Sequence, residues 1–242
     1  MDLDRAIRQH LEMDGFFTGF SVRRTDARAQ EARPAVGDPN ELFEAKSLEG
    51  ISGQISACRK CVLNSLRTNA VPGEGHPKAR IMFVGEAPGA DEDAQGRPFV
   101  GAAGRYLDRI IAACGIRRQD VFVANVLKCR PPHDREPRPE EIIACLPFLR
   151  EQVEIIAPQV IVALGYHAAR TLLNTNSPIG QIRGHFHEYP LPDGRSVKVM
   201  PTFHPAHLLR NPTSENRRKV WEDMKAVLAE LGLPIPAKAG GR

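Results

Sequence analysis

The sequence predicts an α/β fold, a three-layer α/β/α sandwich around a central, mainly parallel four-stranded sheet. The first observation is that short, continuous apolar runs alternate with helical stretches between residues 81 and 231. Strands that are buried on both faces of a parallel sheet have this uninterrupted apolar character. The second is the strand–helix alternation itself, which is typical of a sheet covered on both sides. The 242 residues are enough to bury such a core.

Each element has its own signal in the sequence. The run VIVAL at 160–164 is a short apolar strand that Gly165 ends, and Leu48, Ile51 and Ile55 mark a helix that leads to the first cysteine pair. After that helix we expect, in chain order, a strand at 81–84, a helix at about 103–114, a strand at 121–127, a helix near 139–156, the strand at 160–164, a helix at 166–173, an antiparallel pair near 183–189 and 196–203, and a helix at about 215–231.

Three parts of unequal size are predicted along the chain. Residues 1–50 form an N-terminal extension with a short helix, indicated by apolar residues at four-residue spacing, and a flexible linker at 23–41 that contains few apolar residues. Residues 51–232 form the folded domain, and 233–242 form a flexible tail.

The composition excludes few classes of protein. The chain is 42% hydrophobic and 26% charged, with a formal net charge of +4. This mild basicity is compatible with a polyanionic partner. No apolar stretch approaches the roughly 18 residues that a membrane helix needs. The N-terminal residues lack the apolar core of a signal peptide, so we expect a cytoplasmic protein.

Four of the five cysteines have a spacing that suggests metal ligation. Cys58 and Cys61 form a C-x-x-C pair, and Cys129 and Cys145 follow far along the chain. This spacing fits a zinc site, an iron–sulfur site or buried cysteines without a ligand, since cluster spacing varies while zinc sites usually use two close pairs. Cys114 stands among apolar residues and is expected in the core.

Three polar segments are predicted to meet at one edge of the sheet. They are GEAPG at 85–89, NVLKC at 125–129 and FHPAHLLRNP at 203–212, and each follows a predicted strand. Ligands of open α/β sheets bind at the carboxyl ends of the strands. We therefore expect a binding site where these segments converge.

The residues in these segments have specific chemical uses. The carboxamide of Asn125 offers a donor beside an acceptor, which matches the edge of uracil, whereas cytosine reverses both roles. Phe99 is either a core residue or a platform for a base. His204 is either structural or a donor to an oxygen that gains negative charge. Leu208 and Leu209 are expected to be exposed and to form an apolar wedge between base steps, with Arg210 on a phosphate.

The sequence resembles the family 4 uracil-DNA glycosylases, the iron–sulfur branch of that superfamily. The matching stretches are GEAPGADEDAQGRPFVGAAGRYLD, NVLKCRPP, HPAHLLRNP and the cysteine set, which together span residues 58–231 in the order of the family. The resemblance implies an enzyme that flips uracil out of single- or double-stranded DNA and hydrolyses its N-glycosidic bond, acting as a monomer.

The resemblance also implies the role of each site residue. Gly85, Glu86 and Ala87 would line the uracil pocket, and Glu92 would lie near C5 of uracil. Phe99 would stack on the base, Asn125 would bind its edge, and His204 would donate to O2. A [4Fe–4S] cluster, structural in role, would be held by Cys58, Cys61, Cys129 and Cys145.

Two departures from related patterns leave alternatives open. The best-studied branch of the superfamily has an aspartate at the position of Ala87, so Glu86 is the candidate for activating water. The family usually has asparagine where this chain has Asp134, which adds a negative charge beside DNA. Three other functions remain as alternatives: a covalent uracil trap, for which only His133 is near the required position, a catalytically inactive DNA-binding protein, and a glycosylase for deaminated purines.

Overall fold

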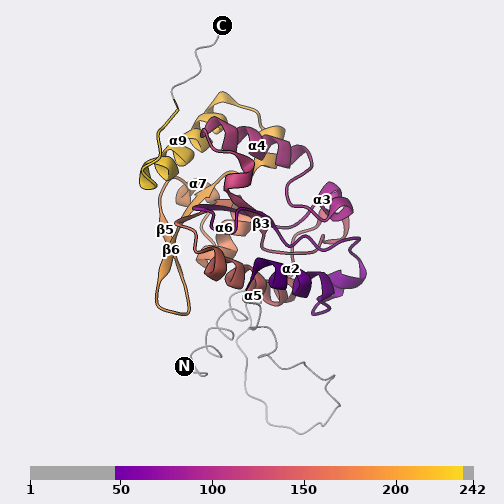
Figure 1. Cartoon of the computed structure of the whole chain (residues 1–242). Helices are drawn as coiled ribbons and strands as arrows, with labels where there is room; N and C mark the ends of the chain where they lie inside the picture. The colour runs from indigo at the N-terminus through magenta and orange to yellow at the C-terminus, as the bar shows by residue number, and fades with distance from the viewer. Residues whose placement is uncertain (1–46, 237–242) are drawn as a thin grey trace, which may run out of the picture. The chain divides into compact units, whose positions relative to one another are not determined.

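Six strands form one sheet in the computed structural model, which describes residues 47–236 (Figure 1). The strand order across the sheet is β1-β3-β2-β4-β6-β5. The four inner strands pair in parallel and the two edge strands pair antiparallel. The predicted mainly parallel sheet is therefore confirmed, and β5 with β6 is the predicted antiparallel pair, whereas the short edge strand β1 was not predicted. The strands are β1 Glu74–Gly75, β2 Ile81–Gly85, β3 Phe122–Asn125, β4 Val160–Leu164, β5 His187–Pro190 and β6 Ser196–Thr202.

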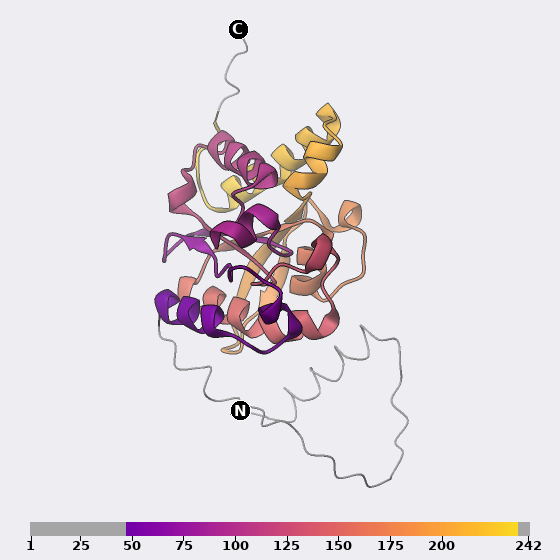
Figure 2. The same cartoon turned by 90° about the vertical axis from the view of Figure 1, so that its right-hand side faces the viewer.

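Helices cover both faces of the sheet and complete the three predicted layers. Helices α4 and α9 lie on one face, and α2 and α5 lie on the other (Figures 1 and 2). The α-helices are α2 Leu48–Ala57, α3 Ala90–Gln95, α4 Ala102–Ala113, α5 Pro139–Ile156, α6 Tyr166–Leu173, α7 Ile179–Ile182, α8 Pro205–Arg210 and α9 Ser214–Glu230. Short 3-10 helices are η2 Val62–Ser65, η3 Arg118–Asp120 and η4 Pro132–Asp134.

The strands are buried on both faces, which explains their continuous apolar sequence. Ile81 and Phe83 of β2 belong to the apolar cluster that includes Leu107 of α4 and Val227 of α9. Met82, between them, is equally buried but lies outside this cluster. Because successive side chains of a strand point to opposite faces, the α4–α9 layer and the opposite helical layer each receive every second residue.

The strand order places one edge of the sheet at a topological switch point. The chain passes from β2 to β3 on one side and later returns to β4 on the other side of β2. Gly85 ends β2, Asn125 ends β3, Gly165 follows β4 and His204 follows β6 by two residues. These parallel strands share one direction, so the four residues lie at the same carboxyl edge, where ligands of such sheets bind.

The differences from the predicted elements are confined to short segments. Helix α5 begins and ends where predicted, and α4 and α9 are each shifted by one residue. The predicted strand at 121–127 ends at Asn125, and α3, α7 and α8 were not predicted. Helices of four to six residues present too few turns for a periodic apolar pattern.

The predicted helix within residues 1–20, the linker at 23–41 and the end of the tail lie outside the described residues. Domain boundaries at 50 and 232 stay predictions, although ordered structure extends beyond both, since α2 begins at Leu48. In the part of the chain that the structure describes, no helix is both long enough and apolar enough to cross a membrane.

Candidate active site

Gly85 allows two other side chains of the site to come close together. A Cβ atom on Gly85 would lie 2.4 Å from Oδ1 of Asn125 and 2.5 Å from Cζ of Phe99, both far inside van der Waals contact. Gly85 and Asn125 are register partners in the parallel pair of β2 and β3. The missing side chain at Gly85 therefore lets the Asn125 carboxamide and the Phe99 ring meet at the end of β2.

The carboxamide oxygen of Asn125 is buried and has no hydrogen-bond partner. Asn125 as a whole is only 2% exposed. An unpaired buried acceptor destabilises a protein by about 1–3 kcal/mol, so such atoms are rare unless a ligand satisfies them. The orphaned Oδ1 atom therefore indicates an acceptor that is kept for a bound donor.

The loop that carries Phe99 is closed by the carboxylate of Glu92. Its Oε1 accepts hydrogen bonds from the backbone N–H groups of Val100 and Gly101, both at 2.9 Å, and its Oε2 accepts one from Gly89 at 3.0 Å. The sequence predicted Glu92 near C5 of uracil. The structure gives this carboxylate three main-chain partners within the loop, which is a role in holding the loop together.

Phe99 adopts a left-handed backbone conformation, with φ of 52°. Such a conformation costs an L-residue about 1–2 kcal/mol and is found where the surroundings enforce it, often at binding sites. One enforcing contact is with Gly104 of α4, where a Cβ atom would lie 1.9 Å from the carbonyl oxygen of Phe99. The ring of Phe99 is thus placed by its loop and by α4.

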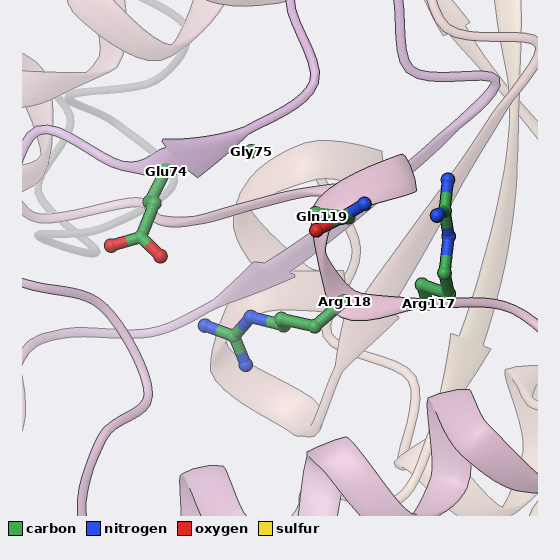
Figure 3. Close-up of a pocket in the computed structure, with 5 residues that line it drawn as sticks. All are labelled: Glu74, Gly75, Arg117, Arg118 and Gln119. Atoms are coloured by element: carbon green, nitrogen blue, oxygen red, sulfur yellow. The ribbon is translucent and has the colours of Figure 1, made fainter.

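Two residues that line a surface pocket also contact the segment before Phe99. The pocket is lined by Glu74, Gly75, Arg117, Arg118 and Gln119, near the amino end of β3 (Figure 3). Glu74 binds Arg97 through two hydrogen bonds of 2.7 and 2.8 Å, and Arg118 donates to the carbonyl oxygen of Pro98 at 2.8 Å. These two residues hold the segment immediately before Phe99, so we assign this pocket a supporting role.

His204 lies beside Phe99 at the beginning of α8. The two ring centroids are 5.7 Å apart and the planes are tilted by 38°. The Nδ1 atom of His204 accepts a hydrogen bond from the backbone N–H of Ala206 at 3.1 Å, and so the neutral ring carries its proton on Nε2. Burial, together with nearby Arg210, His167 and His207, lowers the pKa of His204 to about 4. The ring is therefore a neutral N–H donor at pH 7.

Glu86 and Ala87 continue the chain beyond β2, and both are partly buried. Burial raises the pKa of the Glu86 carboxyl group, and His167 partly opposes this shift. His167 in turn lies 3.5 Å from Glu136, measured from Nε2 to Oε1. Neither His167 nor Glu136 was predicted as a site residue. His167 was predictable, because it closely follows the carboxyl end of the strand at 160–164, where ligands of such sheets bind.

The four cysteines outside the core cluster are all reduced and come from three parts of the domain. Cys58 and Cys61 follow α2, Cys129 follows β3, and Cys145 lies within α5. Burial raises the pKa of Cys145 to about 12, and the nearby thiols of Cys129 and Cys61 contribute to the increase. Burial also raises the pKa of Cys129, and the thiols of Cys61 and Cys58 add to the increase, so the four thiols lie in one region. Cys114 is buried in the α4–α9 cluster, as predicted.

These thiols are not arranged around one metal ion in the described part of the chain. Within residues 47–236, no three Cys, His, Asp or Glu side chains stand close enough together to hold one metal ion. In a [4Fe–4S] cubane each cysteine binds a different iron atom, so the four sulfurs are further apart than the ligands of one zinc ion. Arg67 adds a further contact, since its Nη1 donates to Sγ of Cys129 at 3.0 Å. The donor set and the nearby cation fit an anionic cluster.

The segment after His204 corrects one prediction. Leu208 and Leu209 were both expected to be exposed on a loop, but residues 205–210 form helix α8. Leu208 is 1% exposed and packs in the main apolar cluster, whereas Leu209 is 41% exposed. The reason is helical geometry, because neighbouring residues of a helix point about 100° apart. Only Leu209, followed by exposed Arg210, is available to a partner.

Comparison with known proteins agrees with this arrangement. Residues 72–225 match the profile of the Uracil DNA glycosylase superfamily. The chain belongs to the uracil-DNA glycosylase superfamily. It is 46% identical to a type-4 uracil-DNA glycosylase of Sulfurisphaera tokodaii over 77% of this chain and 86% of the relative. It is 48% identical to the type-4 uracil-DNA glycosylase of Thermotoga maritima, over 74% of this chain and 91% of the relative. The type-4 enzyme of Archaeoglobus fulgidus is 46% identical over 75% and 92%.

The structure gives Asp134 a local role. Asp134 has φ of 52°, a left-handed conformation in which asparagine and aspartate are the most favourable residues after glycine. Its carboxylate accepts two hydrogen bonds from Arg130, at 2.7 and 3.3 Å. Aspartate therefore suits the backbone conformation here, and its charge is paired with Arg130.

The depressed pKa of His204 predicts a pH dependence of stability. Below about pH 6.5 the unfolded chain binds a proton that the folded site does not, so His204 lowers the free energy of unfolding as the pH falls from about 6.5 to about 4. The loss reaches up to about 3 kcal/mol, from 1.36 kcal/mol per pKa unit. His204→Gln should lack this contribution. Urea unfolding at about pH 7 and pH 4.5 should show a smaller pH effect for the variant, and parallel curves would contradict the assignment.

Proposed function

We propose that this site excises uracil from DNA by hydrolysis of the N-glycosidic bond, releasing uracil and leaving an abasic site. The observation that carries the proposal is the buried, unpaired Oδ1 of Asn125 beside Gly85, where the Phe99 ring also approaches, and this ring lies beside His204. The curated relatives named type-4 uracil-DNA glycosylases support the same reaction. Enzymes that act on a base in DNA first rotate the nucleotide out of the stack.

Asn125 supplies base selection. Its Oδ1 accepts the N3–H of uracil, while its Nδ2 donates to O4. Cytosine presents an acceptor at N3 and a donor at C4, so both of its groups and both amide groups would be buried unpaired. Sites that read a hydrogen-bonding edge in this way discriminate strongly. Phe99 covers the face of the base, and such stacking contributes about 1–3 kcal/mol per base.

His204 stabilises the leaving group. As the bond between C1′ and N1 breaks, its electron pair moves to uracil, and the sugar becomes an oxocarbenium ion. The Nε2–H of neutral His204 donates to O2 of uracil, where negative charge develops, while Nδ1 stays bonded to Ala206. A preorganised donor of this kind stabilises the transition state more than the substrate, because the charge on O2 grows as the bond breaks.

Glu86 is the carboxylate that we assign to the attacking water. Water adds to C1′ and loses a proton, and the uracil anion gains one, so the net reaction consumes one water molecule. The raised pKa of Glu86 makes this carboxylate a better proton acceptor than a solvated one. Ala87, at the position where another branch has aspartate, offers no group for this step.

The cysteine region is assigned to a [4Fe–4S] cluster held by Cys58, Cys61, Cys129 and Cys145. When bound, the cluster supplies iron–thiolate bonds that join the end of α2, the end of β3 and α5. The thiols themselves are not among the residues that we assign to the base, so the role that we propose for the cluster is structural. We further propose that the enzyme acts as a monomer in the cytoplasm on single- or double-stranded DNA, with Leu209 and Arg210 in contact with the strand.

Replacing Asn125 tests the central assignment. Asn125→Ala should lower the single-turnover rate of uracil excision by about 10²–10³-fold, because one preorganised hydrogen-bonding group is lost. The assay is alkaline cleavage of a labelled oligonucleotide that contains one uracil. Gln119→Ala, in the supporting pocket, is the matched control and should retain the wild-type rate.

Other results in this assay would contradict the proposal in different ways. If the wild-type protein binds the oligonucleotide but leaves uracil in place, the enzymatic proposal is wrong and an inactive binding protein is favoured. A heat-stable protein–DNA adduct would instead indicate a covalent trap. Equal rates for Asn125→Ala and the wild type would remove Asn125 from the mechanism.

The cluster is tested by comparing two buried cysteines. Cys145→Ser should lose iron and the broad visible absorbance of the wild-type protein, whereas Cys114→Ser should retain both, because Cys114 lies in the apolar cluster away from the other thiols. Metal analysis and absorption spectra give the answer. A wild-type protein that contains zinc and no iron, or equal iron in both variants, would contradict the assignment.

Substitutions of the two leucines of α8 should affect different properties, one the reaction on DNA and the other the stability of the fold. Leu209→Ala should lower kcat/KM on double-stranded DNA by about tenfold, with less effect on single strands, since insertion into a duplex offsets unstacking of a few kcal/mol. Its stability should change by less than about 0.5 kcal/mol. Leu208→Ala should instead lower the free energy of unfolding by about 2–5 kcal/mol, because it leaves a cavity in the core. Equal effects on stability would contradict this division.

A further inference from the structure

Lys128 is a buried lysine between the base site and the cysteine region. It is 1% exposed, among the most deeply buried large side chains of the described domain, and follows Asn125 by three residues and precedes Cys129. Lysine is almost never fully buried unless its amine has partners, because desolvating it is costly. No role was predicted for Lys128 from the sequence.

The amine of Lys128 binds the main chain at Asn125. Its Nζ donates to the carbonyl oxygen of Asn125 at 2.8 Å and to Oε1 of Gln152 at 2.7 Å. Gln152, on α5, donates in turn to the carbonyl oxygen of Pro72 at 2.8 Å. The buried contacts of Lys128 therefore join the last residue of β3 to α5 and to the segment before β1.

The main chain of Lys128 is also held by a hydrogen bond. Its carbonyl oxygen accepts from the N–H of Val71 at 2.8 Å. The N–H of Val126 donates to the carbonyl oxygen of Gly85 at 2.9 Å. The short turn from Asn125 to Cys129 is thus fixed at both ends, and the amine of Lys128 is the contact that reaches back to Asn125.

We propose that Lys128 is a positioning residue for uracil recognition, which holds the Asn125 backbone so that the carboxamide faces the bound base. This inference rests on the proposed function. It does not require Lys128 to touch DNA, uracil or the cluster. The physical reason is that a displacement of a recognition group by about 1 Å lowers a rate about 10²-fold.

A double-mutant cycle separates positioning from a general structural role. Lys128→Met has a similar length but no donor, and it should excise uracil about 10²-fold more slowly than the wild type. If Lys128 acts through Asn125, the variant Lys128→Met/Asn125→Ala should be no slower than Asn125→Ala alone. Multiplication of the two separate losses would overturn the proposal, since independent effects add in free energy.

Two measurements besides excision rate complete the test. Inhibition by free uracil should weaken by about tenfold or more in Lys128→Met, while iron content should stay at the wild-type level. Gln152→Met is the matched control, because it removes the neighbouring hydrogen bond but leaves the amine on Asn125. It should lower the unfolding temperature and leave inhibition by uracil within about threefold. Equal weakening of inhibition in both variants would show that Lys128 has no specific role.

The design also covers failure of folding and failure of the proposed function. If Lys128→Met does not accumulate as folded protein, the same cycle is carried out with Lys128→Gln, whose shorter amide can still pair with Gln152 but does not extend to Asn125. Absence of excision by the wild type would refute the proposed function itself. Excision by the wild type with an unchanged rate for the Lys128 variants would refute only this inference.

Discussion

The closure of one loop by the Glu92 carboxylate is the contact on which the rest of the site depends. The loop leaves β2 at Gly85 and must return to α4 while holding Phe99 in an unfavourable left-handed conformation. Three main-chain hydrogen bonds to one carboxylate connect the beginning and the end of this loop. Hydrogen bonds that backbone N–H groups donate to a carboxylate are among the stronger ones in proteins. The position of the Phe99 ring against Asn125 follows from that closure.

The second constraint is that the site stores unfavourable local states. Phe99 has a strained backbone, and Oδ1 of Asn125 is buried without a partner. Each would destabilise the free protein by about 1–3 kcal/mol or less. In the proposed function, a base with the edge of uracil relieves the unpaired acceptor. The unfavourable states of the free site are then the features that select its ligand.

The cysteine region and the base site share one piece of chain. Asn125, Lys128 and Cys129 lie within five residues, and this segment connects the carboxyl end of β3 with α5. Arg67 donates to Cys129 and also binds backbone carbonyl groups of α2 and its C-terminal end. Iron–thiolate bonds to Cys129 would restrict the motion of this segment at one end, while the amine of Lys128 binds the carbonyl oxygen of Asn125 at the other end. A structural cluster can thus influence recognition without meeting the base.

The limits of prediction are seen in particular residues. The parallel core, the positions of α5 and α9 and the convergence of Gly85, Asn125 and His204 were predictable, since continuous apolar strands must pair and their carboxyl ends then meet. Helix α8 was not, and with it the burial of Leu208 was predicted wrongly, because a single turn and a half of helix leaves no periodic signal. His167 closely follows the strand at 160–164, so its place at this edge was predictable, but its proximity to His204 and Glu86 depends on packing between strands that are distant in sequence.

The sequence by itself determined which chemical groups are present and which strand each of them follows along the chain. Local composition sets the alternation of strand and helix, and hydrogen-bonding capacity is a property of the residue type. The tertiary structure alone decided which of these groups are left unpaired. Glu92 is fully engaged by its own loop, Asp134 is neutralised by Arg130, Lys128 is occupied by Asn125 and Gln152, and Oδ1 of Asn125 remains open. Most of these pairs join residues close in the chain, and they form only because the turns between them adopt one backbone conformation, whereas the pair of Lys128 and Gln152 joins the segment after β3 to α5. Folding alone fixes the distances of a few ångströms on which both kinds of pairing depend.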